Sequence, residues 1–501
     1  MAFIRYYNKK GILYATVVEN IRIDGKVHQK YIANLGRVID KENKIFKNKD
    51  RGTYSYSIEG GYLDMQTEEK AMLQEKLILD FGDSYVLYEY LKQLEFYDVF
   101  SNILPAHHDT LFSMLFYRIV TDKKANYYAE TWWEGNYARI LFPEAKLQSQ
   151  RVSDFLVRLG DEKVQREFFK QYLTVLYGNS ESNTGILIDS TGLENTSKMS
   201  ITQFNNHNGD ISLEVRLIYV IDRKNGMPIY FRYCPGNIID VTTLCTTVAE
   251  LSQYGISIDY AIVDAGYFSE ENVKQLYKNH IHFITRLAPN RKIFKETISN
   301  EISDIISSKY ATRYGERLIY IKKVEVDVYG NIGYAYVGVD IDSRQTQYKR
   351  TVFTAMDDKL SPEDMDKSLE KLGLFMILSS DDMDVSEILP LYYTRQQVEQ
   401  VFDIGKNNAD LLPLRVHNED TFRGHLMLTF MATAIIQRLQ RDIIIKRKKG
   451  SKINPEGLLL KLRNQKCKVY DDNIIPQEAV KNINEIYKLL NITCPVTISK
   501  N

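Results

Sequence analysis

Four residues in the stretch YYTRQQVEQVFDIGK (392–406) have the types and spacing to act on a phosphate group. Tyr392, Arg395, Glu399 and Lys406 lie three, four and seven positions apart. In a helix of about 100° per residue they fall within about 60° of Tyr392, on one side. Arg and Lys bind phosphate oxygens, and a Glu binds a hard metal cation. The alternative is a surface ion pair between Arg395 and Glu399, which contributes only a few tenths of a kcal/mol.

Two aspartates stand at the ends of predicted buried strands. Asp189 follows an apolar run in ILIDSTG, and Asp264 follows a similar run in AIVDAGY. Acids at strand ends of an α/β sheet gather where sites form. Together with Glu399 they would give three converging carboxylates, which are costly unless cations neutralise them. Taken singly, each Asp is explained at least as well as a turn or N-cap acid.

Three such carboxylates predict two Mg²⁺ ions, with Mn²⁺ as a substitute. Mg²⁺ prefers a few carboxylates together with water and phosphate oxygens. Two ions ~3.5–4 Å apart clamp the attacking and leaving oxygens of an in-line displacement at a phosphodiester. This is the chemistry of nucleases and strand-transfer enzymes, and it requires no covalent nucleophile. Arg395 and Lys406 would hold the DNA backbone on either side of the reacting phosphate.

The elements that must position these residues predict an α/β core. Residues 185–290 predict the order β-β-β-α-β-α-β, which begins as an antiparallel meander and continues through crossovers. Alternation at period two predicts strands at 317–341 and 348–356, followed by a helix at 362–372 and a strand in GLFMILSS. Helices dominate from residue 386. The α/β unit is therefore split by a β-rich insertion before its last helix.

The pattern divides the chain into six regions. Residues 1–50 alternate like a small β-meander, and residues 68–180 have helical spacing. We predict an N-terminal β-rich region for DNA binding (1–67), a helical domain (68–182), the first part of the core (183–290), a β-rich insertion domain (291–385), the final core helices (386–445) and a basic C-terminal helical region (446–501).

Composition is that of an ordinary globular protein, with 44% hydrophobic and 26% charged residues. Net charge is zero, but residues 1–51 hold 12 Lys/Arg against 5 Asp/Glu, and residues 438–468 hold 11 against 2. A segregated pattern of this kind permits basic faces for DNA, and the alternative for each run is a solvated face or a loose linker. Four scattered cysteines predict neither a zinc site nor a disulfide framework. We expect no signal peptide and no membrane span, and a location in a reducing cytosol.

The motifs resemble those of DDE transposases of bacterial insertion sequences, in the group with a Tyr-x2-Arg-x3-Glu-x6-Lys signature. Residues 392–406 match the signature at all four positions, and LIDSTG and IVDAGYFSEENV resemble the two Asp motifs. GMPIYFRYCPGNIIDVTTL and TFRGHLMLTFMA are similar to family stretches between the Asp motifs and after the signature. The opening RYYNKKGILYATVVENIRIDGKVHQKYIANLG resembles one branch of the group. The resemblance covers most of residues 1–440.

The resemblance implies an RNase H-like catalytic core, with the insertion between the fifth strand and the last helix. The implied Mg²⁺-binding catalytic triad is Asp189, Asp264 and Glu399. The residues implied to contact DNA near the cleaved end are Tyr392, Arg395 and Lys406. The implied partners are double-stranded DNA, as element ends and target, and a second copy of the chain in a synaptic homodimer. The implied location is the cytoplasm of a prokaryote, in association with the nucleoid.

We therefore expect a transposase that binds terminal inverted repeats, cleaves DNA strands at the element ends and joins the 3′-OH to target DNA. A structure-specific RNase H-like nuclease without strand transfer and a domesticated, inactive DNA-binding protein remain as alternatives. Arg286, at the end of the fifth strand, and Arg423 are further candidate DNA contacts. His425 is expected to pack or hydrogen-bond. Some family members stack a flipped base on a Trp of the insertion, where this chain has none.

Overall fold

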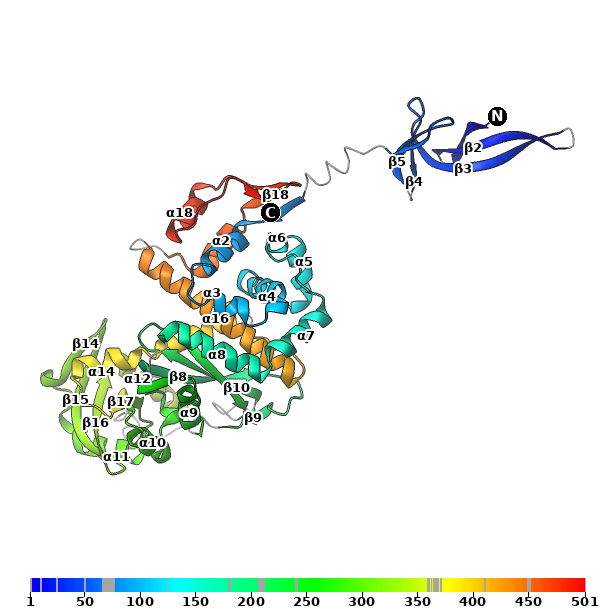
Figure 1. The fold of residues 1–501 in the computed structure, drawn as a ribbon. Coiled ribbons are helices and arrows are strands. Elements are labelled where there is room, and N and C mark those ends of the chain that lie inside the picture. Colours follow the sequence, from blue (N-terminus) through cyan, green and yellow to red (C-terminus); the bar gives the residue numbers. More distant parts are fainter. Residues whose placement is uncertain are drawn as a thin grey trace. The chain divides into compact units, whose positions relative to one another are not determined.

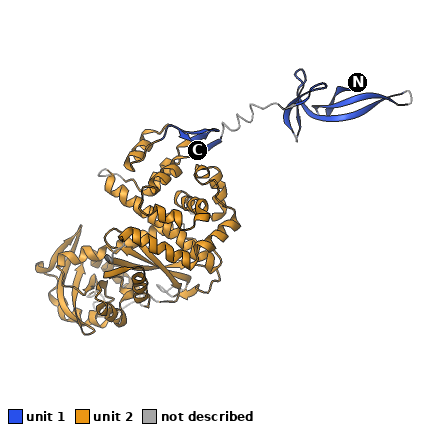
Figure 2. Cartoon of the chain, in the orientation of Figure 1, with its two compact units in different colours: residues 1–79, 467–477, 495–501 blue, residues 80–466, 478–494 orange. Residues whose placement is uncertain are grey.

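The computed structural model forms two compact units, residues 1–79 with 467–477 and 495–501, and residues 80–466 with 478–494 (Figure 2). The residues whose structure is described are 2–9, 11–23, 26–48, 51–64, 77–122, 124–178, 182–205, 212–238, 242–357, 361, 363, 369, 372–409, 411–447 and 452–500.

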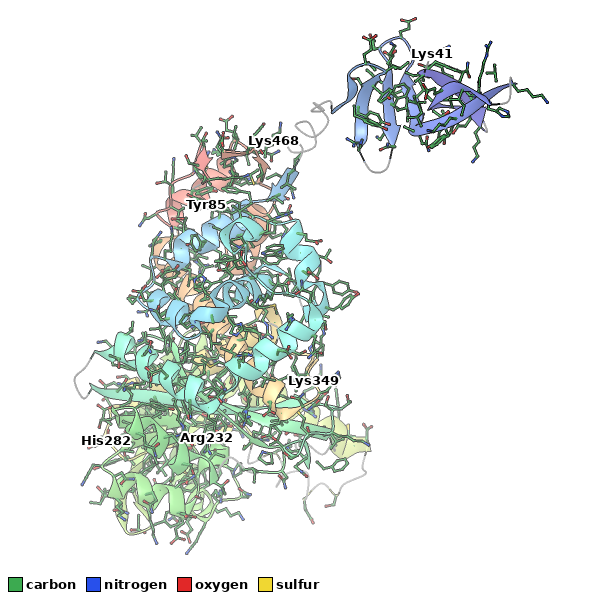
Figure 3. The ribbon with its side chains drawn as sticks, turned by 45° about the vertical axis from the view of Figure 1, so that its right-hand side comes forward. Lys41, Tyr85, Arg232, His282, Lys349 and Lys468 are labelled. Carbon is green, nitrogen blue, oxygen red and sulfur yellow. The ribbon has the colours of Figure 1, made fainter. Side chains whose placement is uncertain are left out.

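The first unit contains a six-stranded antiparallel sheet in which neighbours in sequence are neighbours in space (Figure 1). Its strands are β1 (Ala2–Lys9), β2 (Ile12–Ile23), β3 (Lys26–Asp40), β4 (Ile45–Asn48), β5 (Gly52–Ser57) and β6 (Gly61–Asp64). The sheet has a small core of its own, in which the buried Tyr54 hydroxyl donates to the Leu35 carbonyl at 2.7 Å. Lys41 lies over the Tyr6 ring, 5.2 Å from its centroid (Figure 3). The predicted N-terminal meander is confirmed.

A four-stranded sheet, ordered β20-β19-β18-β7, uses the C-terminal region. Its strands are β7 (Leu77–Asp80), β18 (Lys466–Val469), β19 (Asn473–Pro476) and β20 (Ile498–Ser499). The second unit holds the helices of this region, α17 (Pro455–Leu462) and α18 (Lys481–Leu489). The predicted C-terminal helical region therefore also contains three short strands, which were not expected because KCKV and NIIP are too short to show a strand period.

Helices fill residues 82–177 before the core, as predicted, although LILD (77–80), which was included in the helical pattern, forms strand β7. They are α2 (Gly82–Leu91), α3 (Tyr97–Asn102), α4 (His108–Val120), α5 (Ala129–Glu134), α6 (Ala138–Leu141), α7 (Ser149–Leu159) and α8 (Glu162–Tyr177). They bury an aromatic-rich core that includes Phe100, Phe112 and Phe168. Burial of each such ring contributes about 1.5–3 kcal/mol.

The core sheet follows the predicted order, with one extra short strand. Its elements are β8 (Ser182–Glu194), β9 (Gln203–Asn205), β10 (Ser212–Asp222), β11 (Pro228–Pro235), α9 (Leu244–Gln253), β12 (Ile256–Val263), α10 (Glu270–Lys278) and β13 (His282–Arg286). β10 pairs antiparallel with β8 and β11, whereas β12 pairs parallel with β8 and β13. Ser269 caps α10 by accepting from the Asn272 N–H at 3.1 Å, as its spacing predicted.

The insertion is not a separate sheet. Its elements are α11 (Lys292–Glu301), β14 (Ala311–Tyr314), β15 (Arg317–Val328), β16 (Asn331–Asp340), α12 (Ile341–Asp357) and β17 (Leu374–Ser379). β17 pairs with β13, so one sheet runs in the order β11-β10-β8-β12-β13-β17-β16-β15-β14. Residues 291–385, predicted as an independent domain, therefore extend the core sheet through their own strands.

The predicted strand at 348–356 is wrong, because this segment belongs to α12. Tyr348, Val352 and Met356 recur every four residues, which is a helical period that the alternation of Thr, Val and Phe concealed. Tyr348 and Met356 are exposed, so burial does not select the conformation. Most of the predicted helix 362–372 lies outside the described residues.

Three helices complete the second unit: α14 (Val385–Tyr393), α15 (Gln396–Asn408) and α16 (Glu419–Lys446). α16 is a long, largely buried helix that packs against α15 and β11, and it crosses α7 at Gly160 and Gly424 (Figure 1). A Cβ at Gly424 would stand 1.9 Å from the Leu156 carbonyl oxygen, so the crossing requires glycine. Among the described helices, none is long and apolar enough to cross a membrane.

Candidate active site

The parallel pairing of β8 and β12 brings Asp189 and Asp264 to the same edge of the sheet. Ile188 pairs with Val263, and the two aspartates are the next residues on their strands. Asp264 directly follows the last residue of β12, as predicted. Asp189 does not end its strand, because β8 continues to Glu194 along its antiparallel partner β10. Asp189 therefore marks the end of the parallel pairing, where polar side chains become accessible.

The signature does not form one continuous helix. Tyr392 lies in the last turn of α14, and Arg395 is the N-cap of α15. At this junction the Arg395 N–H donates a hydrogen bond to the Tyr392 carbonyl (3.1 Å), and the Val398 N–H donates one to the Arg395 carbonyl (2.9 Å). These i→i−3 bonds form a 3₁₀ turn, in which residues three apart eclipse. The turn therefore aligns Tyr392 with Arg395 more closely than an α-helix would.

One guanidinium joins the three carboxylates. Arg395 Nη1 lies 2.9 Å from Asp189 Oδ2 and 3.6 Å from Asp264 Oδ1, and Nη2 lies 3.2 Å from Glu399 Oε1. The Arg395 side chain is 19% exposed. Burial disfavours its charge, but Asp264, Tyr392, Asp189 and Glu399 outweigh burial and raise the pKa of Arg395. The three carboxylates therefore converge on the Arg395 guanidinium, just beyond the end of β12.

The donor set suits a hard divalent cation. In the described part of the chain, no three or more His, Cys, Asp or Glu side chains are arranged to hold a metal ion as they stand. Nevertheless, Asp189, Asp264 and Glu399 already converge on a positive group and offer only carboxylate oxygens, the ligands that Mg²⁺ prefers. These residues fit the magnesium site that the sequence predicts.

Tyr392 is buried close to Asp264 and Arg395. Its side chain is 5% exposed, and burial, reinforced by Asp264 and opposed by Arg395 and Arg286, raises the pKa of its phenol to about 12. Tyr392 and Arg286 both line a small cavity of about 70 Å³, which also includes Tyr393. Arg286, a predicted DNA contact on β13, is therefore close to the site.

Lys406, near the C-terminal end of α15, contacts strand β8, which also carries Asp189. Its Nζ donates to Thr191 Oγ1 at 2.6 Å, and burial lowers the pKa of Lys406. Thr191 lies two residues after Asp189, so both side chains are on the same face of β8. Phe402 of α15 stacks on Tyr219, which pairs with Asp189, and this packing fixes the helix against that face. Thr191 was not predicted, although its spacing from Asp189 was a usable signal.

Sequence reasoning also missed two charged residues of β10 that lie on the opposite face of the sheet from Asp189. Arg216 is buried and donates to Ser190 Oγ at 2.9 Å, and it lies 3.6 Å from Glu214. A Cβ at Gly192 would meet the Glu214 carboxylate at 2.2 Å, so the glycine makes room for the acid. In the sequence, Glu214 and Arg216 look like the solvated positions of an alternating strand, and no signal marks them as buried.

Arg423 and His425 have other surroundings. Arg423 Nη2 lies 2.5 Å from Asp420 Oδ1, and Arg423 lines a cavity of about 790 Å³ beside Tyr233. The residues of that cavity do not include the three carboxylates. His425 is buried, with Nδ1 2.9 Å from Arg118 Nη2 and Nε2 3.3 Å from the Leu411 carbonyl. This is the packing and hydrogen-bonding role expected for His425.

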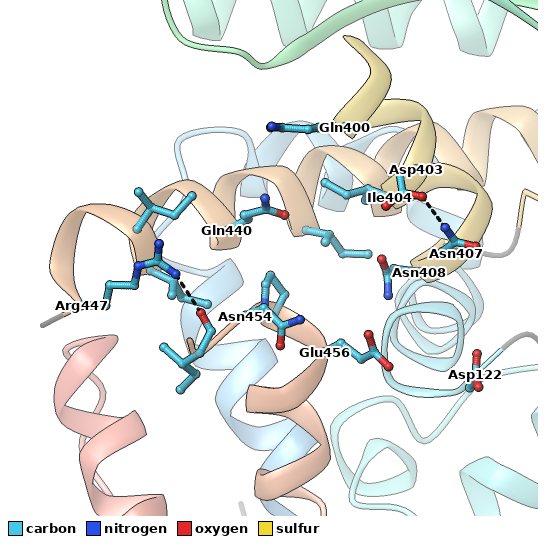
Figure 4. A pocket seen from close by; sticks show the side chains of 15 residues that line it. Asp122, Gln400, Asp403, Ile404, Asn407, Asn408, Gln440, Arg447, Asn454 and Glu456 are labelled. Atoms are coloured by element: carbon cyan, nitrogen blue, oxygen red, sulfur yellow. Dashed lines mark hydrogen bonds between the residues drawn. The ribbon is translucent and has the colours of Figure 1, made fainter. Parts of the chain in front are cut away.

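A separate cavity of about 530 Å³ lies against another face of α15 (Figure 4). Its charged side chains are Asp122, Asp403, Glu456 and Arg447. Asp403 accepts from Asn407, and Arg447 donates to the Ile453 carbonyl at 3.4 Å. With three acids and one arginine, this cavity is unsuited to a DNA phosphate, unlike the Arg395 and Lys406 side of the helix.

Comparison with known families agrees with these positions. The sequence model of the transposase DDE domain matches residues 181–435, about half of the chain, including both aspartates and the whole signature. The chain belongs to the transposase DDE domain family. Among solved structures, it is similar to a piggyBac transposase synaptic complex with hairpin DNA, with a TM-score of 0.41 and 11% identity over 71% of this chain and 70% of that chain. No curated protein matches the sequence.

Proposed function

We propose that this DDE transposase acts on a bacterial insertion sequence. It binds the terminal inverted repeats, cleaves DNA strands at the element ends and joins the freed 3′-OH to target DNA. The observation that carries this proposal is the convergence of Asp189, Asp264 and Glu399 on one cation. The mixed sheet and the following helix α15 support an RNase H-like core, with β14–β17 as its insertion.

The triad would hold two Mg²⁺ ions, or Mn²⁺ in their place. When bound, such ions activate the attacking water or 3′-hydroxyl and stabilise the leaving oxygen. Asp189 and Asp264 come from adjacent strands, and Glu399 comes from α15, so the packing of α15 on β8 sets their separation.

The basic residues around the triad would hold DNA. The guanidinium of Arg395 has the planar fork that pairs with phosphate oxygens, and Lys406 supplies a point charge about three turns further on. Arg286 and the Tyr392 phenol lie beside them and would contact the strand near the cleaved end. Arg423, on the next helix, would contact DNA outside this cluster.

The partners are double-stranded DNA, as element ends and target, and a second copy of the chain. Joining two ends to one target requires two active sites together, so a homodimer is the smallest assembly that suffices. As the transposase of a bacterial insertion sequence, the protein would act in the cytoplasm of a prokaryote, at the nucleoid. The basic residues 1–51 are suited to hold the element ends by phosphate contacts.

Cleavage of a defined duplex tests the proposal. Full-length protein is incubated with end-labelled DNA that flanks its coding region, with Mg²⁺ and with EDTA. We expect Mg²⁺-dependent nicks at matching repeats, and a loss of at least 100-fold in Glu399→Gln. Glu296→Gln is the matched control, since Glu296 is 62% exposed in an i,i+4 pair, and Glu399 is 58% exposed in another. Unchanged cleavage by Glu399→Gln would contradict the proposal.

A further inference from the structure

The hairpin of β2 and β3 extends beyond the rest of the N-terminal sheet (Figure 1). β1 begins at Ala2, which pairs with Glu19, so past this point β2 pairs with β3 alone among the described strands. The extension consists of Asn20–Ile23 paired with Lys26–Gln29. Four residues of strand give the ribbon a length of about 13 Å, and the DNA major groove, ~12 Å wide, admits a two-stranded β-ribbon. A two-stranded ribbon of this size fits that groove.

Burial gives this ribbon no role in the core of its own sheet. Asn20, Arg22 and all of the residues 26–29 are exposed, and Ile21 is only partly covered. In contrast, Ala15 and Val17, nearer the start of β2, are completely or almost completely buried. A two-stranded ribbon that is exposed on both faces is marginal in stability by itself. Its surface is therefore available to a partner.

The register sorts the ribbon into two chemically different faces. Asn20 pairs with Gln29 and Arg22 pairs with Val27, so these four side chains share one face, which Tyr31 continues. Arg5 belongs to the same face, because its Nη1 donates to Gln29 Oε1 at 3.2 Å. This face therefore presents two amides, two guanidinium groups and one exposed aromatic ring, listed as Asn20, Gln29, Arg5, Arg22 and Tyr31, and no acid.

The other face is basic at its edges. Lys26 and His28 lie on β3, opposite Ile23 and Ile21, and Lys30 lies opposite Glu19. Lysine side chains are long enough to reach the backbone phosphates that line a groove. The first face thus offers hydrogen-bonding groups for base edges, and the second offers charge for phosphates.

We infer that the β2–β3 ribbon enters the major groove of double-stranded DNA at the element ends, with Asn20, Arg22 and Gln29 against base edges. This inference rests on the proposed function. Asn and Gln pair with adenine N6 and N7, and Arg pairs with guanine O6 and N7. The Arg5 contact leaves Gln29 Oε1 a second lone pair and leaves its amide N–H groups available. Lys26 and Lys30 contact phosphates.

Charge decides between DNA and a second copy of the ribbon. Residues 1–51 hold 12 Lys/Arg against 5 Asp/Glu. Two such sheets would repel each other, whereas the phosphates of DNA complement them. The exposed Val27 and Tyr31 supply the apolar contact that thymine methyl groups accept.

Selection from random DNA tests the inference. The full chain is used to select from duplexes with 25 random base pairs, and the binding of the enriched sequence is measured against salt. We expect Asn20→Ala and Gln29→Ala to relax an adenine preference, and Arg22→Lys to relax a guanine preference at unchanged salt slope. Each of these variants should bind the enriched sequence with about tenfold lower affinity than the wild type. Lys26→Ala should weaken all duplexes alike and reduce the salt slope by about one.

Lys274→Ala, which replaces an exposed lysine of α10 outside residues 1–51, is the control and should leave the enriched sequence unchanged. Thermal unfolding of each variant checks that the exposed substitutions leave the fold intact. If the ribbon variants select the same sequence as the wild type with the same affinity, the inference is wrong while the proposed function stands. If the ribbon variants change only the oligomeric state of the DNA-free protein, the ribbon is a contact between copies and the inference is wrong. If the wild type enriches no sequence, both the inference and the proposed end recognition fail.

Discussion

At the scale of the residue, the guanidinium of Arg395 balances carboxylates from three elements that are distant in sequence. Replacing it by alanine leaves three acids facing one another around a half-buried position. We expect Arg395→Ala to lower the free energy of unfolding by about 1–3 kcal/mol in EDTA, because charged hydrogen bonds are lost and like charges repel. Urea denaturation measures this loss.

The same variant distinguishes a shared cation position from a simple ion pair. Adding Mn²⁺ should raise the melting temperature of Arg395→Ala more than that of the wild type, because the added ion meets an uncompensated set of acids. Arg313→Ala is the control, since Arg313 forms only an exposed pair with Glu316 and should cost less than about 0.5 kcal/mol. Equal responses of Arg395→Ala and the wild type to Mn²⁺ would count against a metal site at these carboxylates.

His425 makes stability depend on pH. Burial, reinforced by Arg118 and Arg415, holds the pKa of His425 well below its usual 6.5, so the folded protein keeps the ring neutral. The unfolded chain takes up a proton below about pH 6.5, and stability should fall with decreasing pH by up to about 1.4 kcal/mol per pH unit. His425→Asn keeps an acceptor for Arg118 and should reduce this slope. Urea midpoints at pH 5 and 8 compare the two proteins, and identical slopes would contradict the assignment.

At the scale of the element, glycine fixes how the helical region meets the core. Gly424 of α16 contacts the Leu156 backbone of α7, whereas a Cβ at Gly405 of α15 would meet only ordinary contacts, the nearest at 3.6 Å. We expect Gly424→Ala to lower the free energy of unfolding by about 1–3 kcal/mol, because the added methyl group overpacks the crossing. Gly405→Ala should be neutral or stabilise by up to about 1 kcal/mol, because alanine favours helix. Thermal unfolding tests both, and equal effects would contradict the close crossing.

Sequence predicted the elements that have a strong local period. The apolar runs before Asp189 and Asp264 identified β8 and β12, and the capping pattern at Ser269 identified the start of α10. The joining of β17 to β13 was not predictable, because a pairing partner leaves no local pattern. The helix at 348–356 was missed because β-branched residues there also fit a strand.

The candidate site was predictable in its acids but not in their common partner. The spacing of 392–406 placed the side chains on one side, but the 3₁₀ turn between α14 and α15 came from backbone bonding that the residue types do not reveal. The contact of Arg395 with Asp189 spans 206 positions of sequence, so only the fold could bring the two together. Part of the resulting convergence depends on the parallel register of β8 and β12.

At the scale of the whole molecule, one unit carries a basic sheet, and the other carries the candidate active site within a single extended sheet. The proposed function requires both on one chain, because end recognition would select the phosphodiester on which the carboxylates would act. A nuclease of the same core type would cleave without joining, and a domesticated binding protein would do neither. Strand cleavage and strand joining, measured together, therefore separate the three possibilities.

The most direct measurement is the joining of a precut, 3′-OH-terminated element end to a supercoiled target plasmid by the full chain in Mg²⁺. We predict covalent joined products with the wild type, and none with Asp189→Asn, Asp264→Asn or Glu399→Gln. DNA binding of the variants, measured separately, should remain within a few-fold of the wild type. Cleavage of uncut ends without any joining, or joining by the Glu399→Gln protein at the wild-type rate, would contradict the account.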